Sequence, residues 1–270
     1  MTQTHTLKIP TVSNFEMEYY YATEEARYNA RNFPPHLHDR LEMYVLLDGD
    51  ASFMVESNLY KLNSFDAIIS KPNEMHNCIL NTDSVHRHLC FWFDPSCDFL
   101  FADFLSHNFG ENNRLSPDEN GKARLSVLFE ELRISTDQKD GQRQFYLLLE
   151  ILDIYRKSIA KKDFVQYLPP TLKIILADIN AHFTTIHDLS YFTEKYFLSQ
   201  STLNRLFRTY LHTTPKIYLE TKRLGHSKIL LKEGKTVLEA CMQAGFPDYS
   251  NYIRLFKKRF GITPGQYRDS

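Results

Sequence analysis

Four side chains in the first third of the chain could together bind a metal ion. His36, His38 and Glu42 follow one another closely, and His76 lies further along. Three imidazoles and one carboxylate form a donor set for Zn²⁺, Fe²⁺, Mn²⁺ or Ni²⁺ that leaves open positions for a ligand. On a strand, His36 and His38 face the same side, and Glu42 can join them across a bend.

Near the end of the chain a sequence pattern occurs twice, in two copies that are 49 positions apart, and each copy carries polar side chains that could bind a ligand. Ser201 corresponds to Ser250, residues 205–207 (RLF) to 254–256 (RLF), and 214–215 (TP) to 263–264 (TP). Leu189, Phe197 and Tyr218 correspond in the same register to Leu238, Phe246 and Tyr267. Two copies are too few for a solenoid, so we expect a pair of supersecondary modules.

Each copy is predicted to fold as helix, tight turn, helix. The helices are expected over 186–196 and 199–210 in the first copy and over 237–244 and 250–260 in the second, with a spacer helix over 219–231. Ser199 should cap the second helix of the first copy. Gly245 suits a left-handed residue after a helix, Phe246 should plug the turn, and Pro247 should start the following helix.

The outward face of the second helix in each copy carries small polar and basic residues. In the first copy they are Gln200, Ser201, Asn204, Arg205 and Arg208; in the second they are Tyr249, Ser250, Asn251, Arg254, Lys257 and Lys258. Arginine can pair with guanine and asparagine with adenine, while serine and lysine hold phosphates. A basic helix face is often only a solvated surface, but its duplication favours two helix-turn-helix units that enter successive major grooves.

The charge distribution agrees with an anionic partner for the C-terminal part. The whole chain of 270 residues has a formal net charge of −1. Residues 171–270 contain 15 Lys and Arg against 8 Asp and Glu, a net charge of +7, which leaves −8 for the remainder. Opposite signs in the two parts suggest that one part faces an anion such as DNA.

The elements that position these side chains change in type along the chain. Short strands are expected over 41–47, 51–56, 59–62, 67–70, 76–80 and 88–93, with a hairpin turn at 48–50 (DGD). Helical spacing of apolar residues follows over 99–109, 122–134 and 145–160. The segment from 161 to Pro169 and Pro170 is the best linker, and only helices are expected after it.

Composition narrows the class of protein further. No apolar run approaches the roughly 18 residues that span a bilayer, and the polar N-terminus does not resemble a secretory signal. The four cysteines (Cys78, Cys90, Cys97 and Cys241) contain no CxxC pair, so we expect reduced, buried thiols in a cytoplasmic protein.

The C-terminal part resembles the DNA-binding domain of the AraC/XylS family of transcription regulators. The resemblance rests on the runs 245–250 (GFPDYS), 256–264 (FKKRFGITP) and 267–268 (YR). It implies two helix-turn-helix units joined by a long helix, with Ser201, Asn204 and Arg205 facing one groove. Ser250, Asn251 and Arg254 would face the next groove. Pro247 departs from the family pattern, which usually has a small polar residue there.

The N-terminal part resembles a cupin. Residues 35–42 (PHLHDRLE) with Gly49 match the first cupin motif, and 65–76 (FDAIISKPNEMH) resemble the second, although Phe65 and Asn73 stand where glycines are usual. In sensory cupins attached to this type of DNA-binding domain, the His-x-His and Glu side chains are often retained without metal, where they line a small-molecule pocket or hold the barrel mouth by hydrogen bonds. Metal-dependent cupin enzymes are the alternative. Phe33, Tyr44, Phe53 or Phe91 could form aromatic walls for a sugar, whereas His86 and His88 are expected to be structural or exposed.

These observations predict an α+β protein with three parts: a cupin-like ligand-sensing barrel (1–95), a helical dimerisation and linker region (96–163), and a DNA-binding domain with two helix-turn-helix motifs (164–270). The predicted ligand-binding residues are His36, His38, Glu42, Tyr44 and His76, with no required cofactor and a divalent metal as an open option. The expected function is transcription regulation through double-stranded DNA, modulated by a small-molecule effector. A homodimer and RNA polymerase are the expected protein partners; a metal-dependent enzyme fused to a DNA-binding module is the alternative.

Overall fold

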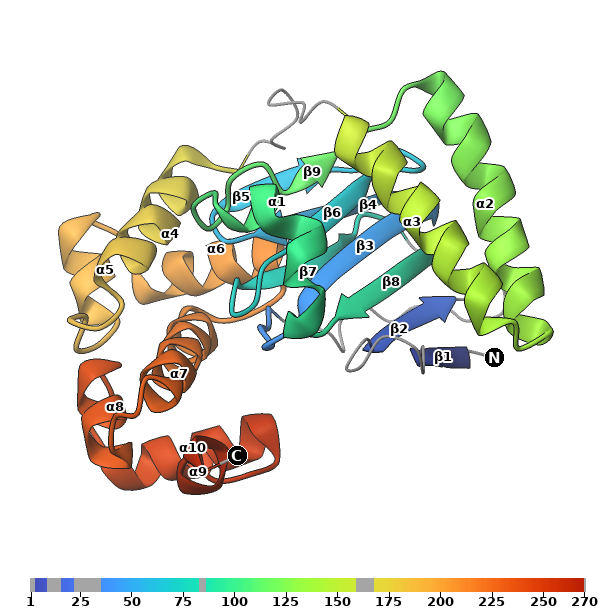
Figure 1. The fold of residues 1–270 in the computed structure, drawn as a ribbon. Coiled ribbons are helices and arrows are strands. Elements are labelled where there is room, and N and C mark those ends of the chain that lie inside the picture. The colour runs from blue at the N-terminus through green and yellow to red at the C-terminus, as the bar shows by residue number, and fades with distance from the viewer. Residues whose placement is uncertain (1–2, 9–15, 22–34, 83–85, 159–167, 270) are drawn as a thin grey trace. The chain divides into compact units, whose positions relative to one another are not determined.

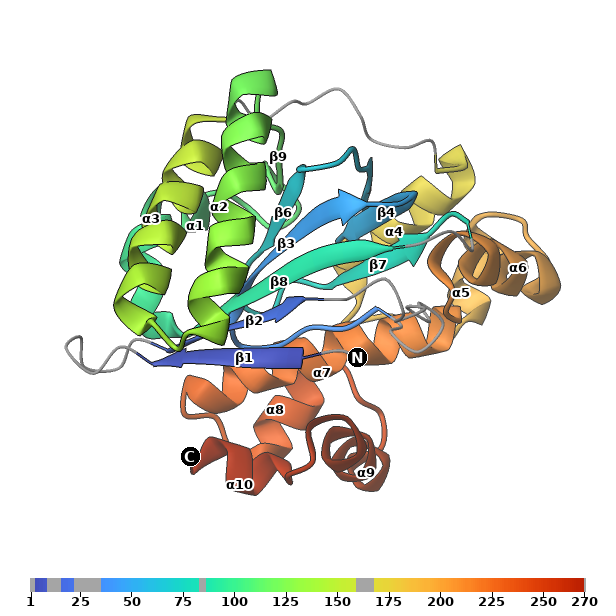
Figure 2. The ribbon, with the colours of Figure 1, turned by 90° about the vertical axis from the view of Figure 1, so that its right-hand side faces the viewer.

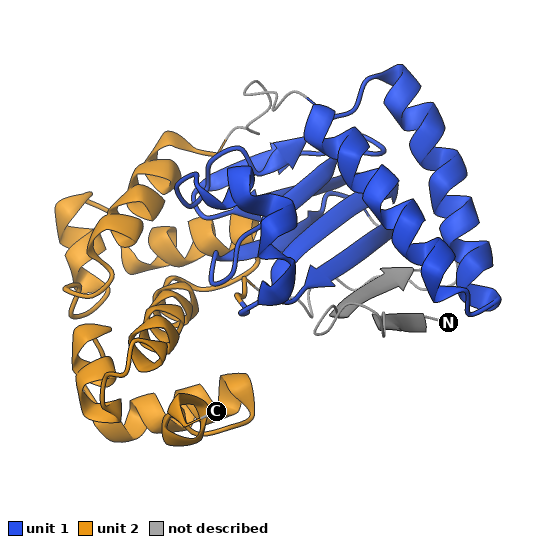
Figure 3. Ribbon diagram, in the orientation of Figure 1, with its two compact units in different colours: residues 1–33, 38–166 blue, residues 34–37, 167–270 orange. Residues whose placement is uncertain are grey.

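The computed structural model describes residues 3–8, 16–21, 35–82, 86–158 and 168–269. These residues divide into two compact units, shown in blue and orange in Figure 3. Unit 1 comprises 1–33 and 38–166, and unit 2 comprises 34–37 and 167–270. Unit 1 contains both strands and helices and unit 2 is helical, which confirms the predicted α+β class.

Unit 1 is built on two antiparallel sheets. The larger has the order β1-β2-β8-β3-β6-β9 and the smaller has the order β5-β4-β7. Their strands are β1 (Gln3–Lys8), β2 (Glu16–Tyr21), β3 (Leu41–Asp48), β4 (Ala51–Val55), β5 (Asn58–Lys61), β6 (Ala67–Ser70), β7 (His76–Leu80), β8 (Arg87–Phe93) and β9 (Arg114–Leu115). The six strands from β3 to β8 agree with the sequence predictions to within one or two residues, whereas β1, β2 and β9 were not predicted.

Two helices cover one face of the larger sheet, as Figures 1 and 2 show. They are α2 (Glu119–Asp137) and α3 (Gly141–Lys157), and a 3₁₀ helix (Pro95–Phe101) and α1 (Ala102–Leu105) precede them. Asp118 and Asp140 cap α2 and α3 by accepting backbone N–H groups. Because successive residues of a strand face opposite sides, Met43 and Phe91 join Leu128 of α2 in the core under the helices.

The other face of the larger sheet is turned toward the smaller sheet. The buried cluster between the sheets includes Tyr44 and Ile68 from the larger sheet and Phe53 and Cys78 from the smaller one. We call the region between the two sheets, around this cluster, the lumen. Its side chains come from the alternate strand positions that the helices do not cover.

Unit 2 consists of helices in its described part. They are α4 (Pro170–His182), α5 (Ser190–Lys195), α6 (Gln200–Leu211), α7 (Pro215–Lys232), α8 (Val237–Gln243), α9 (Tyr249–Phe260) and α10 (Pro264–Arg268). Threonine caps begin α7, α8 and α10, and Thr236 and Thr263 form reciprocal capping boxes with Glu239 and Gln266. The two predicted helix-turn-helix units are therefore α5–α6 and α8–α9, and α7 connects them.

Three local predictions need correction. Pro247 does not start α9, because Asp248 is the N-cap residue and Pro247 precedes it. The first helix of the first module is shorter than expected and begins at Ser190. His38 is not on a regular strand but in the bend before β3. The three-part division of the chain with boundaries at 95 and 163 stays a prediction.

Candidate functional site

The lumen of unit 1 contains a polar cluster that was predicted from the sequence. Glu42 lies on β3 and His76 begins β7, while His38 reaches them from the bend before β3. Their potential metal-ligand atoms lie within 4.8 Å of one another. His36, the fourth predicted member, lies in the segment 34–37 that groups with unit 2, so its participation stays a prediction.

The Glu42 carboxylate is the centre of this cluster. Its Oε2 lies 3.0 Å from His38 Nε2 and 3.7 Å from His76 Nε2, and it accepts a hydrogen bond of 2.7 Å from Trp92 Nε1. Burial alone would raise the pKa of Glu42, but the charges of His76 and His38 and their contacts with the carboxylate together outweigh burial and lower it well below its ordinary value. The carboxylate therefore stays ionised inside the sheet sandwich.

The backbone fixes the proton positions of both imidazoles. His38 Nδ1 lies 2.9 Å from the carbonyl oxygen of Arg40, and His76 Nδ1 lies 2.8 Å from that of Glu74. Because a carbonyl only accepts, each Nδ1 must carry a proton and donate it. If the imidazole is neutral, its Nε2 then has no proton and carries a lone pair. This lone pair faces the Glu42 carboxylate, which is also only an acceptor.

Such a convergence of lone pairs requires positive charge between them. Protonation of an imidazole supplies it, and the pKa of His76 is indeed raised: burial alone would lower it, but the charge and contact of Glu42, the hydrogen bond to the Glu74 carbonyl and the charge of Glu74 together outweigh burial. A divalent ion would supply it equally well, because metal-bound histidines usually donate their other N–H to a carbonyl or carboxylate. The geometry therefore fits a metal ion or the polar groups of a small ligand.

A second polar cluster lies further along the lumen and joins Tyr44, a predicted ligand-binding residue, to His86 and His88, which were not predicted as site residues. The Tyr44 hydroxyl is 2.8 Å from His86 Nε2, and the Tyr44 and His88 rings stack with centroids 5.0 Å apart. Burial lowers the pKa of His86 to about 4 and that of His88 to about 3, with a smaller contribution to His88 from its neighbour. Both imidazoles are therefore neutral at pH 7 and can donate and accept hydrogen bonds.

The sequence did contain a signal for this second cluster. His88, Cys90 and Trp92 alternate along β8 with residues that face the helices, so they share the lumen face with Tyr44 of β3. Of the aromatic residues expected to line a pocket, Tyr44 and Phe53 do lie in the lumen. Phe91 instead packs under the helices, and Phe33 lies outside the described residues.

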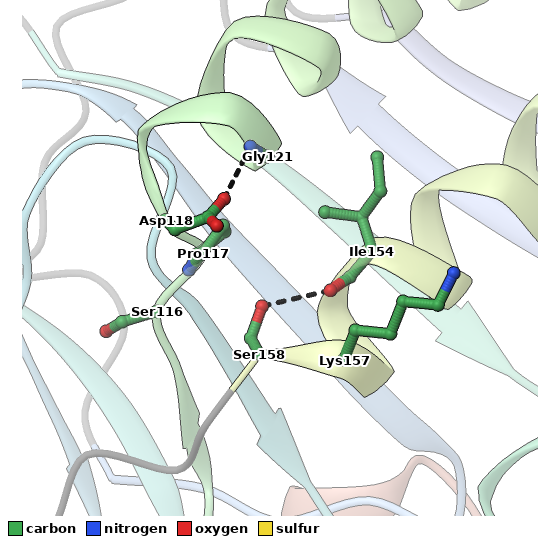
Figure 4. Close-up of a pocket in the computed structure, with 7 residues that line it drawn as sticks. All are labelled: Ser116, Pro117, Asp118, Gly121, Ile154, Lys157 and Ser158. Carbon is green, nitrogen blue, oxygen red and sulfur yellow. Dashed lines mark hydrogen bonds between the residues drawn. The ribbon is translucent and has the colours of Figure 1, made fainter.

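A cavity of about 330 Å³ opens elsewhere in unit 1, between the N-terminal end of α2 and the C-terminal end of α3 (Figure 4). Two of the polar side chains around it are engaged locally, and Ser116 Oγ is a single buried hydroxyl for which the structure shows no hydrogen-bond partner. Asp118 accepts from the Gly121 N–H and the Ser158 hydroxyl donates to the Ile154 carbonyl, as Figure 4 shows. Because binding pockets need polar groups that converge on the ligand, we regard the lumen as the better candidate site.

In unit 2 the residues predicted to contact DNA lie on α6 and α9. Each helix buries one face, which includes Leu203 and Phe207 of α6 and Tyr252 and Phe256 of α9. The opposite face of each helix therefore points to solvent. Asn204 and Asn251 are half-buried, and the other predicted contact residues are exposed: Gln200, Ser201, Arg205, Arg208, Tyr249, Ser250, Arg254 and Lys257. The Arg254 guanidinium donates to the Asn251 side-chain oxygen at 2.6 Å, so these two side chains are aligned on one face.

A buried carboxylate supports the first module from outside it. Asp178 of α4 accepts hydrogen bonds from Tyr191, Lys195 and Tyr196 at 2.9–3.2 Å. These three residues belong to α5 or follow it directly, so Asp178 attaches α5 to α4. Helix α5, which precedes α6 in the first module, is thereby held in place.

The turn of the first module differs from the register expected from the repeat. Tyr196 is the C-cap residue that follows α5, Phe197 is left-handed with φ 52°, and Ser199 caps α6. In the second module Gly245 holds the left-handed position and Phe246 is buried behind it. The first turn is therefore one residue shorter, and half-buried Leu198, rather than Phe197, takes the place of Phe246.

Within the described part of the chain, the helices are all too short or too polar to cross a bilayer. The four cysteines are free and buried, as expected.

Comparison with known proteins assigns both units. Residues 18–151 match the model of the AraC-like ligand binding domain, and residues 192–270 match that of a helix-turn-helix domain. Among curated relatives, the HTH-type transcriptional activator RhaS of Escherichia coli O139:H28 is 23% identical over 90% of both chains. The uncharacterized HTH-type transcriptional regulator YbfI of Bacillus subtilis is 25% identical over 82% of both chains.

Similar solved structures include ToxT from Vibrio cholerae O395, bound in that crystal to (E)-4-(8-methylnaphthalen-1-yl)but-3-enoic acid. It is 17% identical, with a TM-score of 0.37, over 99% of this chain and 98% of that one. The two domain matches lie in the order expected from the sequence and together span most of the chain. The chain belongs to the AraC family of transcription regulators, with an AraC-like ligand-binding domain followed by a helix-turn-helix DNA-binding domain.

Proposed function

We propose that this protein regulates transcription by binding a specific double-stranded DNA sequence through α6 and α9, under the control of a small molecule bound in the lumen of unit 1. The observation that carries the proposal is the pair of recognition helices. Neither α6 nor α9 contains an acidic residue, and both expose arginine beside small polar groups. This composition suits phosphates and base edges.

The length of the connecting helix supports simultaneous binding by both modules. Helix α7 has 18 residues, which corresponds to about 27 Å at 1.5 Å per residue. Successive major grooves on one side of a duplex are roughly 34 Å apart. A rigid helix of this length can therefore separate two recognition helices by about the spacing that neighbouring grooves require.

The lumen supports the proposal of an uncharged, hydroxyl-rich effector such as a sugar. His86 and His88 are neutral there, Glu42 and His38 offer charged or polar hydrogen-bonding groups, and Tyr44 adds an aromatic surface. Aromatic surfaces with a few convergent polar groups are typical of sites for such ligands. If a divalent ion is bound, His38, Glu42 and His76 would hold it, and it would polarise an effector oxygen.

The helices of unit 1 support a homodimer. Val127 and Ile134 of α2 and Tyr146 of α3 are between 42% and 55% exposed, although large apolar residues are usually buried. We propose that a second copy of the chain covers them. Contact with RNA polymerase stays a prediction.

The test of DNA binding uses the full chain and a duplex selected from a random library by the wild-type protein. Arg205→Ala and Arg254→Ala should each weaken binding by about 1–3 kcal/mol and relax specificity at the contacted bases. Arg87→Ala is the matched control, because it removes a partly exposed arginine that is paired with Asp48 on the strands of unit 1, outside α6, α9 and the proposed dimer helices. If the two variants bind as tightly as this control in gel-shift titrations, α6 and α9 are not the recognition helices.

A further inference from the structure

The two helix-turn-helix modules present different side chains at the left-handed position of their turns. In the second module this residue is Gly245, with φ 85°. In the first module it is Phe197, with φ 52°, and the residue is 94% exposed. An aromatic residue in this conformation and with this exposure is unusual on both counts.

The surroundings of the two turns explain why only one of them needs glycine. A Cβ atom at Gly245 would lie 2.3 Å from the carbonyl oxygen of Thr184, in the connection between α4 and α5. The second turn is therefore packed against other backbone. The exposure of Phe197 means that the first turn is open to solvent, so a large side chain fits there without a clash.

The fold itself gains little from a phenylalanine at position 197. The left-handed conformation is strained for a bulky residue, and glycine or asparagine would adopt it more easily. The exposed ring also adds almost no buried surface to the core, in which Leu198 takes the neighbouring place. A strained residue that does not serve the core is a reason to look for a binding role.

The position of Phe197 in the module indicates what it contacts. It lies two residues before Ser199, the N-cap of α6, and residues 197–208 contain two arginines and no acid. In helix-turn-helix proteins the N-terminal residues of the recognition helix contact base edges, so the turn before it lies at the rim of the major groove. The apolar group exposed at that rim is the C5 methyl of thymine, which phenylalanine can contact.

We propose that Phe197 is a specificity-determining residue whose ring packs against a thymine methyl at the edge of the groove that α6 enters. The proposal rests on the proposed function, in which α6 reads DNA. It gives the first module an apolar contact that the second module lacks at the matching position. The two half-sites of the operator should then differ, with thymine required in only one of them at this place.

The first test separates stability from DNA affinity in the full chain. Phe197→Gly should raise the midpoint of thermal unfolding of unit 2, because it removes the strain, yet bind the selected duplex about tenfold more weakly because the apolar contact is lost. Phe197→Asn tolerates the left-handed conformation without the freedom of glycine and should lose as much affinity. His212→Gly is the matched control: His212 has φ 51° at the other end of α6, so this variant should gain stability and keep wild-type affinity.

The second test removes the methyl group from the DNA. Replacing each thymine of the selected duplex in turn by deoxyuridine should reveal one position at which wild-type affinity falls about fourfold, the value of one buried methyl group. Phe197→Gly should show no loss at that position. If Phe197→Gly retains the wild-type sensitivity to this replacement, the thymine contact is wrong.

The outcomes also separate this inference from the proposed function. If Phe197→Gly and Phe197→Asn bind DNA as the wild type does while Arg205→Ala binds weakly, α6 is a recognition helix but Phe197 does not contact DNA. If Arg205→Ala also binds normally, the assignment of α6 fails, and the role of Phe197 fails with it.

Discussion

The two buried histidines of the second lumen cluster should make unit 1 sensitive to acid. The ordinary pKa of histidine is 6.5, and burial lowers that of His86 to about 4 and that of His88 to about 3. The unfolded chain therefore binds more protons than the folded one below pH 6.5, and the free energy of unfolding falls as the pH falls. At pH 5, about 1.5 pH units below the unfolded value, each histidine costs about 2 kcal/mol of stability.

The sole tryptophan of the chain makes this effect measurable in the intact protein. Trp92 lies on β8 and its indole N–H donates to Glu42, so its fluorescence reports the unfolding of unit 1. Urea unfolding at pH 7 and pH 5 gives the loss of stability for each variant. His88→Gln should lose about 2 kcal/mol less than the wild type over this interval.

The comparison between variants isolates the buried histidine. The pKa of His76 is raised, so its protonation stabilises the folded state as the pH falls and partly offsets the loss in every variant that retains it. His107→Gln, which replaces an exposed histidine of the same unit, should behave as the wild type does. If His88→Gln loses as much stability as the wild type between pH 7 and pH 5, His88 is not held neutral by burial.

Two further predictions concern the second module and the first lumen cluster. Gly245→Ala should destabilise unit 2 by about 2–4 kcal/mol, from left-handed strain and the clash with Thr184. Gly234→Ala has the same left-handed φ but open space around it, so it should cost only about 1–2 kcal/mol; equal losses in far-ultraviolet circular dichroism melts would contradict the clash. Added Zn²⁺ should change the fluorescence of Trp92, because an ion at Glu42 competes with its hydrogen bond to the indole. Glu42→Gln should abolish this response, and a full response in that variant would place the ion elsewhere.

Local sequence patterns predicted most of the regular elements. The limits of β6 and β7 agree with the expected strands, and the caps at Ser199 and Gly245 were recognisable from residue type alone. Such features depend on neighbours within a few residues, because capping and turn geometry are local properties of the backbone. The duplication indicated two modules for the same reason, since each module is a continuous segment.

Tertiary structure decided the features that depend on residues far apart in the chain. His86 and His88 appeared structural or exposed in the sequence, and only the facing sheets bury them beside Tyr44. The repeat paired Phe197 with Phe246 by counting positions. The second turn packs against Thr184 and therefore requires glycine at position 245. The first turn is open to solvent, is one residue shorter, and leaves Phe197 exposed. Local residue types therefore specified which elements form, and the contacts between distant segments decided which side chains face the lumen and the solvent.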